Sequence, residues 1–91
     1  MYFVYIVRCA DASLYTGFAR DPEERVAVHN RGKGAKYTAS RLPVTLVYQE
    51  PCESRSGALK RECEIKTWSR TRKEALIRSA EGGHYVRVSG T

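Results

Sequence analysis

The sequence predicts an α/β (α+β) fold, in which a small three-stranded, mainly antiparallel sheet is flanked by helices in the order β-β-α-β-α-α. Three observations lead to this prediction. Residues 2–7 form an aromatic and β-branched run that fits a strand buried on both faces. Residues 21–24 form a strong helix start, and two further helix patterns follow a later strand-like run near residue 45. With 91 residues the chain has room for one small domain, which we place at residues 1–80, with a short C-terminal tail at 81–91.

The first two strands are predicted to form a hairpin. The polar segment at residues 10–13 is short enough to turn the chain back before the sequence Tyr-Thr-Gly at 15–17. Tyr5 and Tyr15 share one face of this hairpin only if the loop has odd length or a bulge intervenes, because strand side chains alternate between the two faces. Gly17 has no side chain, so another group can approach its backbone closely.

The next elements are a helix, a basic loop and a third strand. Asp21 caps the helix, Pro22 occupies its first position, and the helix is expected to run to about Asn30. A basic, glycine-containing loop then follows the stop at Gly32. The third strand is predicted at residues 44–49.

Two more helices are predicted after the third strand. Ser54 caps a long helix at about residues 55–68. Thr71 and Glu74 have the spacing of a capping box for a final helix that ends before the glycines at 82–83.

Charge and cysteine content narrow the class of partner. Sixteen Lys and Arg against ten acids give a net charge of +6, which favours an anionic partner. Nucleic acid fits better than a membrane, because no apolar stretch approaches bilayer length and no amphipathic basic helix dominates. Cys9, Cys52 and Cys63 form neither a disulfide framework nor a zinc ligand pattern, and the N-terminus reads without a secretory signal. We therefore expect a reduced, cytoplasmic protein.

Several polar side chains are candidates for chemistry. Arg25 and His29 are four residues apart on the first helix and share a face. Glu62 borders an apolar stripe on the long helix, where a carboxylate is costly unless it is paired or bound to a cation. Each of these residues alone is compatible with an ordinary surface or ion-pair role, and Tyr5 and Tyr15 are each compatible with a core position.

Taken together, Tyr5, Tyr15, Arg25, His29 and Glu62 resemble the GIY-YIG nuclease superfamily in their order and in the elements that carry them. Val-Tyr-Ile at residues 4–6 stands where that family has Gly-Ile-Tyr or a variant, and Tyr-Thr-Gly at 15–17 stands for Tyr-Ile-Gly.

More narrowly, the chain is similar to the small stand-alone bacterial branch of the superfamily, whose signature resembles the stretches at 14–17, 29–38 and 53–56. The resemblance extends from residue 2 to about residue 78, and it implies a GIY-YIG endonuclease-like fold. The chain departs from many members at Phe18, where some carry lysine, and near Glu74, where a polar residue such as asparagine is common.

The resemblance implies a metal-dependent phosphodiester hydrolase that acts as a DNA endonuclease. Glu62 matches the family's metal-binding glutamate, Arg25 its helix arginine, and His29 the histidine or tyrosine one turn further on. Tyr5 and Tyr15 match the two motif tyrosines, one of which acts as a general base directly or through water. The implied cofactor is a single Mg²⁺ or Mn²⁺ ion, and one carboxylate suffices for Mg²⁺ because this ion keeps several waters.

The loop at residues 31–41 carries four cations and no acid. We expect Lys33 and Lys36 to hold phosphates that flank the cleaved one, and Tyr37 to stack on a base. Any single lysine there is also compatible with a solvated loop. The residues expected to bind nucleic acid are Gly17, Arg31, Lys33, Lys36, Tyr37 and Arg41. Because no reader module such as a zinc finger is appended, recognition is expected to depend on DNA structure or damage rather than on sequence.

Two rival functions remain open at this level. The first is a catalytically weak nucleic-acid-binding module that keeps the fold. The second is an interaction subunit that works beside other repair or recombination proteins. RNA is an alternative substrate to DNA, and the sequence decides neither the oligomeric state nor which tyrosine is the base.

Overall fold

The sheet of the protein is three-stranded and entirely antiparallel, with the order β2-β1-β3. A computed structural model describes residues 1–81 of the chain. The strands are β1 (Tyr2–Arg8), β2 (Leu14–Ala19) and β3 (Thr45–Cys52). The helices are α1 (Pro22–Asn30), α2 (Lys36–Ala39), α3 (Arg55–Lys66) and α4 (Arg70–Glu81). The predicted fold class is confirmed, and the short helix α2 is the one addition to the predicted order.

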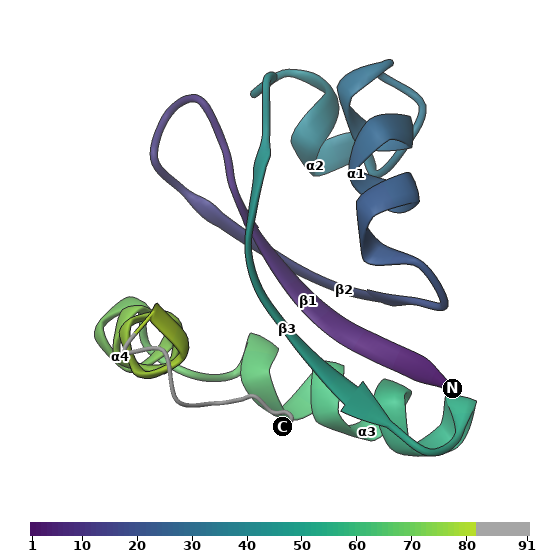
Figure 1. Cartoon of the computed structure of the whole chain (residues 1–91). Coiled ribbons are helices and arrows are strands. Elements are labelled where there is room, and N and C mark those ends of the chain that lie inside the picture. The colour runs from purple at the N-terminus through teal and green to yellow at the C-terminus, as the bar shows by residue number, and fades with distance from the viewer. Residues whose placement is uncertain (82–91) are drawn as a thin grey trace.

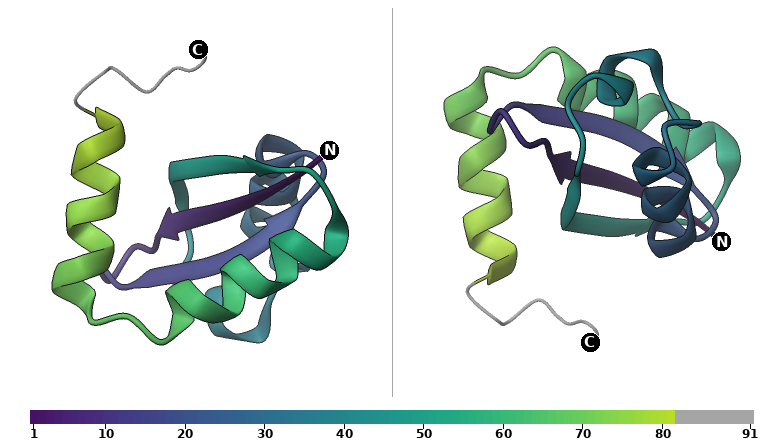
Figure 2. Two further views of the ribbon diagram at one scale, coloured as in Figure 1. Left: turned by 90° about the horizontal axis from the view of Figure 1, so that it is seen from below. Right: turned by 90° about the horizontal axis from the view of Figure 1, so that it is seen from above.

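Helices cover both faces of the sheet. Helices α1 and α2 lie on one face and α3 on the other, while α4 lies beyond the end of α3 beside the turn of the β1–β2 hairpin (Figures 1 and 2). The central strand β1 serves both faces: Val4 and Ile6 pack toward α3, and Tyr5 and Val7 pack toward α1. All four side chains are at most 1% exposed, so the expectation of a strand buried on both faces is confirmed.

The hairpin register puts the two motif tyrosines on one face. Tyr5 lies opposite Gly17, and Val7 lies opposite Tyr15, so the two tyrosines share the face covered by α1. The strands end at Arg8 and restart at Leu14, which leaves an odd loop of five residues. Ala12 adopts a positive φ of 71° in this loop. The sequence required either an odd loop length or a bulge to place both tyrosines on one face, and the five-residue loop meets the first of these conditions.

The predicted caps of α1 and α3 are confirmed. The Asp21 carboxylate accepts a hydrogen bond from the Glu24 amide at 3.2 Å, and the Ser54 hydroxyl accepts one from the Gly57 amide at 3.0 Å. Gly32 follows α1 with a φ of +79°, a conformation that glycine adopts readily. Helix α3 ends at Lys66, two residues before the predicted end.

The predicted capping box of α4 is wrong. The helix begins at Arg70, and the Ser69 hydroxyl accepts a hydrogen bond from the Arg72 amide at 3.2 Å. The Glu74 carboxylate does not reach back to the helix start, because Arg8 binds both of its oxygens at 2.8 and 2.9 Å. A contact between residues 66 positions apart therefore overrides the local pattern.

Strand β3 is three residues longer at its end than predicted. Cys52 lies opposite Tyr2, and Pro51 lies opposite Phe3. Proline is tolerated there because β3 is an edge strand, so the missing amide hydrogen does not interrupt a ladder. Of the predicted tail, residues 82–91 lie outside the described part of the chain. Within residues 1–81, no helix is both long and apolar enough to cross a membrane.

Candidate active site

The centre of the candidate site is a buried contact between Tyr5 and His29. Tyr5 projects from the middle of β1 and is 1% exposed, and His29 projects from the last turn of α1 and is fully buried. The Tyr5 hydroxyl lies 2.9 Å from Nε2 of His29. The Tyr15 ring meets the His29 ring edge-on with centroids 5.4 Å apart. Three of the five candidate catalytic residues are therefore in direct contact.

Two glycines make room for this pair. A Cβ atom at Gly17 would lie 2.6 Å from the Tyr5 hydroxyl oxygen, and a Cβ atom at Gly34 would overlap Nδ1 of His29. The group that approaches the Gly17 backbone is thus the Tyr5 phenol. The close approach that the sequence indicated at Gly17 is thus made by another part of the protein, and contact of Gly17 with nucleic acid stays a prediction.

A hydroxyl on α2 holds the other side of the imidazole. Thr38 is fully buried, and its Oγ1 lies 2.8 Å from Nδ1 of His29 and donates to the Ala35 carbonyl at 3.0 Å. The short contacts fit one directed chain, in which Tyr5 O–H donates to Nε2, Nδ1–H donates to Thr38, and Thr38 donates to the Ala35 carbonyl. The Ala35 amide, 3.3 Å from Nδ1, supports the opposite tautomer. The tautomer thus depends on Thr38.

The environment keeps both members of the pair neutral. Burial raises the pKa of Tyr5 to about 12; Tyr15 adds to the rise, and a hydrogen bond and the charge of Arg25 oppose it. Burial also lowers the pKa of His29, and the positive charge of Arg25 lowers it further. A neutral phenol beside a neutral imidazole is consistent with Tyr5 as donor and Nε2 as acceptor.

Arg25 and Glu62 complete the group from opposite faces of the sheet. Arg25 on α1 is half-buried and interacts with Tyr5 both by hydrogen bonding and by charge, and Glu62 on α3 also raises the pKa of Tyr5 by its charge. Glu62 is 9% exposed. Its Oε2 lies 3.4 Å from Nζ of Lys66, one turn later on α3. Tyr5, Tyr15 and His29 are thus in contact, whereas Arg25 and Glu62 act on Tyr5 from opposite sides of the sheet, which does not match the expectation that all five converge on one patch. The catalytic roles of the five residues stay predictions.

Glu62 fits one kind of metal ion. Among residues 1–81, no group of three or more His, Cys, Asp or Glu side chains is placed to hold a metal ion. This excludes a closed, all-protein cage in that part of the chain. A single, nearly buried carboxylate suits Mg²⁺ or Mn²⁺, because Mg²⁺ retains water ligands and accepts substrate phosphate oxygens. The Lys66 ammonium is half-exposed and can leave the carboxylate.

Four side chains next to the Tyr5–His29 contact are linked by successive pairwise contacts. The Arg41 guanidinium lies 3.8 Å from the Tyr37 ring centroid, the Tyr37 and Tyr15 rings stack at 6.1 Å, and the Lys66 ammonium lies 5.7 Å from the Tyr15 centroid. Tyr37 is thus in contact with both Arg41 and Tyr15, although it is 40% exposed. Stacking of Tyr37 on a base stays a prediction, and it would have to compete with these contacts.

The cations of the basic loop fall into two groups. Arg31, Lys33 and Lys36 are exposed, as expected for side chains that reach a nucleic acid backbone. Arg41 instead binds within the protein, donating to the Tyr37 carbonyl at 2.7 Å and to the Asp11 carboxylate at 3.1 Å. Arg41 thus connects the basic loop to the turn between β1 and β2.

The sequence did not single out Thr38, Gly34 or Lys66 as site residues. Thr38 and Gly34 both lie within the signature-like stretch at 29–38, which is the signal that could have indicated them. Lys66 follows Glu62 by four residues, a spacing at which opposite charges meet on a helix.

Comparison with known proteins identifies relatives over most of the chain. A family model described as the GIY-YIG catalytic domain matches residues 1–75. UPF0213 proteins of Staphylococcus aureus strains Mu3 and N315 are each 62% identical over 77 residues, which cover 85% of this chain and 94% of theirs. The solution structure of a UPF0213 protein from Bacillus halodurans matches 98% of each chain with a TM-score of 0.56 and 42% identity. A solution structure of a protein from E. faecalis matches with a TM-score of 0.60 and 36% identity, over 92% of this chain and 90% of that one.

Proposed function

The chain belongs to the GIY-YIG catalytic domain family, and from this premise we propose that it is a metal-dependent DNA endonuclease directed by DNA structure or damage. The family implies a nuclease and a nucleic acid substrate. The observation that carries the proposal is the buried contact of Tyr5 with His29 at 2.9 Å, surrounded by Arg25, Tyr15 and Glu62. A module that only binds nucleic acid has no need of a buried phenol that contacts an imidazole, with a nearly buried carboxylate close enough to act on that phenol by its charge.

Tyr5 is the better candidate for the general base. A phenol with a pKa near 12 is no base at neutral pH unless its proton has an acceptor. His29 supplies one, because its neutral Nε2 already accepts the Tyr5 hydrogen bond. As the phenol oxygen takes a proton from the attacking water, its own proton passes to Nε2. The water oxygen bonds to phosphorus, the bond to the 3′ oxygen breaks, and the leaving 3′ oxygen takes a proton from solvent to become a hydroxyl.

Arg25 and Thr38 both support this proton transfer. Arg25 favours the phenolate, since its charge and its hydrogen bond both lower the pKa of Tyr5. Its planar group of donors also suits a non-bridging phosphate oxygen. The Thr38 hydroxyl accepts a hydrogen bond from Nδ1–H, and this keeps the imidazole oriented with Nε2 toward Tyr5.

Glu62 is the residue that would hold a divalent metal ion. When bound, that ion would neutralise charge on the phosphate and on the leaving 3′ oxygen. Lys66 would then move from Glu62 toward substrate phosphate, because its present partner would be engaged. The exposed cations of the 31–36 segment would hold flanking phosphates.

The test is cleavage of single-stranded, duplex, flapped and branched DNAs, with RNA counterparts, in Mg²⁺ or Mn²⁺. Glu62→Ala is expected to abolish cleavage while binding persists. The matched control is Glu64→Ala on the same helix, whose exposed carboxylate pairs with Arg61. Equal loss in the two variants would assign the effect to helix charge. A wild-type protein that cleaves nothing, with Glu62→Ala unchanged in binding and stability, would establish the rival binding module.

A further inference from the structure

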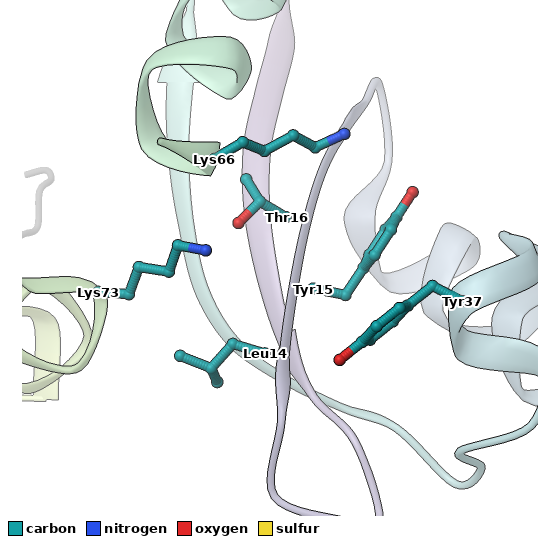
Figure 3. Close-up of a pocket in the computed structure, with 6 residues that line it drawn as sticks. All are labelled: Leu14, Tyr15, Thr16, Tyr37, Lys66 and Lys73. Atoms are coloured by element: carbon teal, nitrogen blue, oxygen red, sulfur yellow. The ribbon is translucent and has the colours of Figure 1, made fainter. Parts of the chain in front are cut away.

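A pocket of about 250 Å³ lies at the outer edge of β2, next to the candidate active site. It is lined by Leu14, Tyr15, Thr16, Tyr37, Lys66 and Lys73 (Figure 3). Two of these residues, Tyr15 and Lys66, also border the group around Tyr5. The pocket therefore continues the site from the end of α3 to the start of α4, in a region to which no role has been assigned.

Lys73 is distinguished by its lack of a partner. Five Lys and Arg side chains of the described region are half-buried: Arg8, Arg25, Arg41, Arg61 and Lys73. Arg8, Arg41 and Arg61 each pair with a carboxylate, and Arg25 interacts with Tyr5. Lys73 has no carboxylate partner within residues 1–81, and its ammonium extends into the pocket (Figure 3). This arrangement favours an external anion.

Thr16 provides a second, independent sign. Its hydroxyl oxygen is the one buried side-chain nitrogen or oxygen atom of the described residues that has no hydrogen-bond partner. Buried polar atoms in native proteins almost always have a partner, so an unpaired one calls for an explanation. In Figure 3 the Lys73 side chain points toward Thr16, and Lys66 extends past it toward Tyr15. Lys73 and Thr16 thus line the same pocket, and the unpaired Thr16 hydroxyl is buried beside it.

The lining suits a phosphate better than a nucleobase. A base would have to compete with the contacts that these rings already make, since Arg41 lies over the Tyr37 ring, and the Tyr15 ring contacts Tyr37 and lies near Lys66. Two ammonium groups and a hydroxyl are instead donors, and phosphate is an acceptor. We propose that this pocket binds the phosphate of a nucleotide adjoining the scissile one, held by Lys73 and Lys66, and that the Thr16 hydroxyl, buried beside the pocket, gains its missing partner when the two lysines turn onto that phosphate. This inference rests on the proposed nuclease function, and it directs the substrate strand along the β2 edge toward α4.

The test is a calorimetric titration of the full chain with thymidine 3′,5′-bisphosphate, performed without divalent ions. Lys73→Gln is expected to weaken binding about tenfold, the loss expected for one charge-assisted hydrogen bond. The matched control is Lys60→Gln, which removes the same charge from an exposed position on α3 outside the pocket. Equal weakening by the two variants would overturn the proposal, because binding would then report net charge alone.

Thr16→Val tests the hydroxyl separately from the fold. Valine keeps the volume and removes the unpaired oxygen, so we expect a higher melting temperature together with weaker bisphosphate binding. Unchanged binding in this variant would overturn the assignment of the hydroxyl.

Cleavage measured in parallel separates this inference from the proposed function. A wild type that cleaves DNA, with Lys73→Gln binding the bisphosphate normally, would refute the pocket and leave the nuclease. A wild type that cleaves nothing, with binding lost in Lys73→Gln, would refute the nuclease and leave a phosphate pocket.

Discussion

Replacing Thr38 with valine is expected to reverse the tautomer of His29. Valine matches the volume of threonine and removes the hydroxyl that lies 2.8 Å from Nδ1. With that partner gone, Nδ1 is stabilised by accepting from the Ala35 amide at 3.3 Å, and the ring proton moves to Nε2. Nε2 then donates to Tyr5 and can no longer accept its proton.

The expected magnitude follows from what is lost. Removing a positioned general acid or base slows a reaction by roughly 10²–10⁴-fold, and the tautomer change removes the acceptor of the Tyr5 proton. Stability falls less, by about 1–3 kcal/mol, because the Ala35 carbonyl loses its donor whereas Nδ1 finds another partner. Thr38→Ser keeps the hydroxyl and is expected to retain most of the rate.

The assay is single-turnover cleavage, combined with ¹⁵N NMR of the His29 ring to identify the protonated nitrogen. Because burial and Arg25 lower the pKa of His29, the wild-type rate is expected to fall only when the pH drops well below 6.5, as Nε2 becomes protonated. Thr38→Val should be slow at every pH. A Thr38→Val protein that keeps both the wild-type rate and the proton on Nδ1 would refute the reasoning.

Three further outcomes are expected. Tyr5→Phe leaves charge and nearly all volume intact, so single-turnover cleavage should slow by ~10²-fold or more while DNA affinity, measured by anisotropy, is unchanged; an unaffected rate would exclude Tyr5 as the base. Combining Lys33→Ala with Lys36→Ala should weaken binding to all sequences alike and reduce the slope of log affinity against log salt by about 2, since each phosphate contact contributes about 0.9 on duplex DNA. The pKa of Glu74 is lowered from 4.5 to about 2, chiefly by its hydrogen bonds from Arg8, so the stability it contributes is complete above pH 4.5 and is lost as the pH falls toward 2; acid unfolding of Glu74→Gln should lack this component.

The sequence predicted the framework of the fold because its signals there are local. The Asp21 and Ser54 caps and the alternation that places Tyr5 and Tyr15 on one face each depend on a few neighbouring residues, and all agree with the structure. The group around Tyr5 was predicted through resemblance, since nothing in the spacing alone brings Glu62 to that point.

The features that the sequence missed depend on distant contacts. Helix α2 has only four residues and no side-chain cap, and what holds it is the contact of Thr38 with His29 on α1. Ser69 and Thr71 are both suitable caps for α4, and the choice follows from Arg8, which engages Glu74 from the other end of the chain. In the sequence Lys73 has no feature that separates it from other exposed lysines, and only the fold brings it to the same pocket as Thr16.

The five-residue turn between β1 and β2 also restricts how this chain can change in length over evolution. Inserting or deleting one residue there would turn Tyr15 to the α3 face and replace it beside His29 with a neighbour from β2, unless a bulge restored the register. Changes of two residues preserve the orientation of every side chain in the strand. Descendants of this sequence are thus expected to vary in this turn by even numbers.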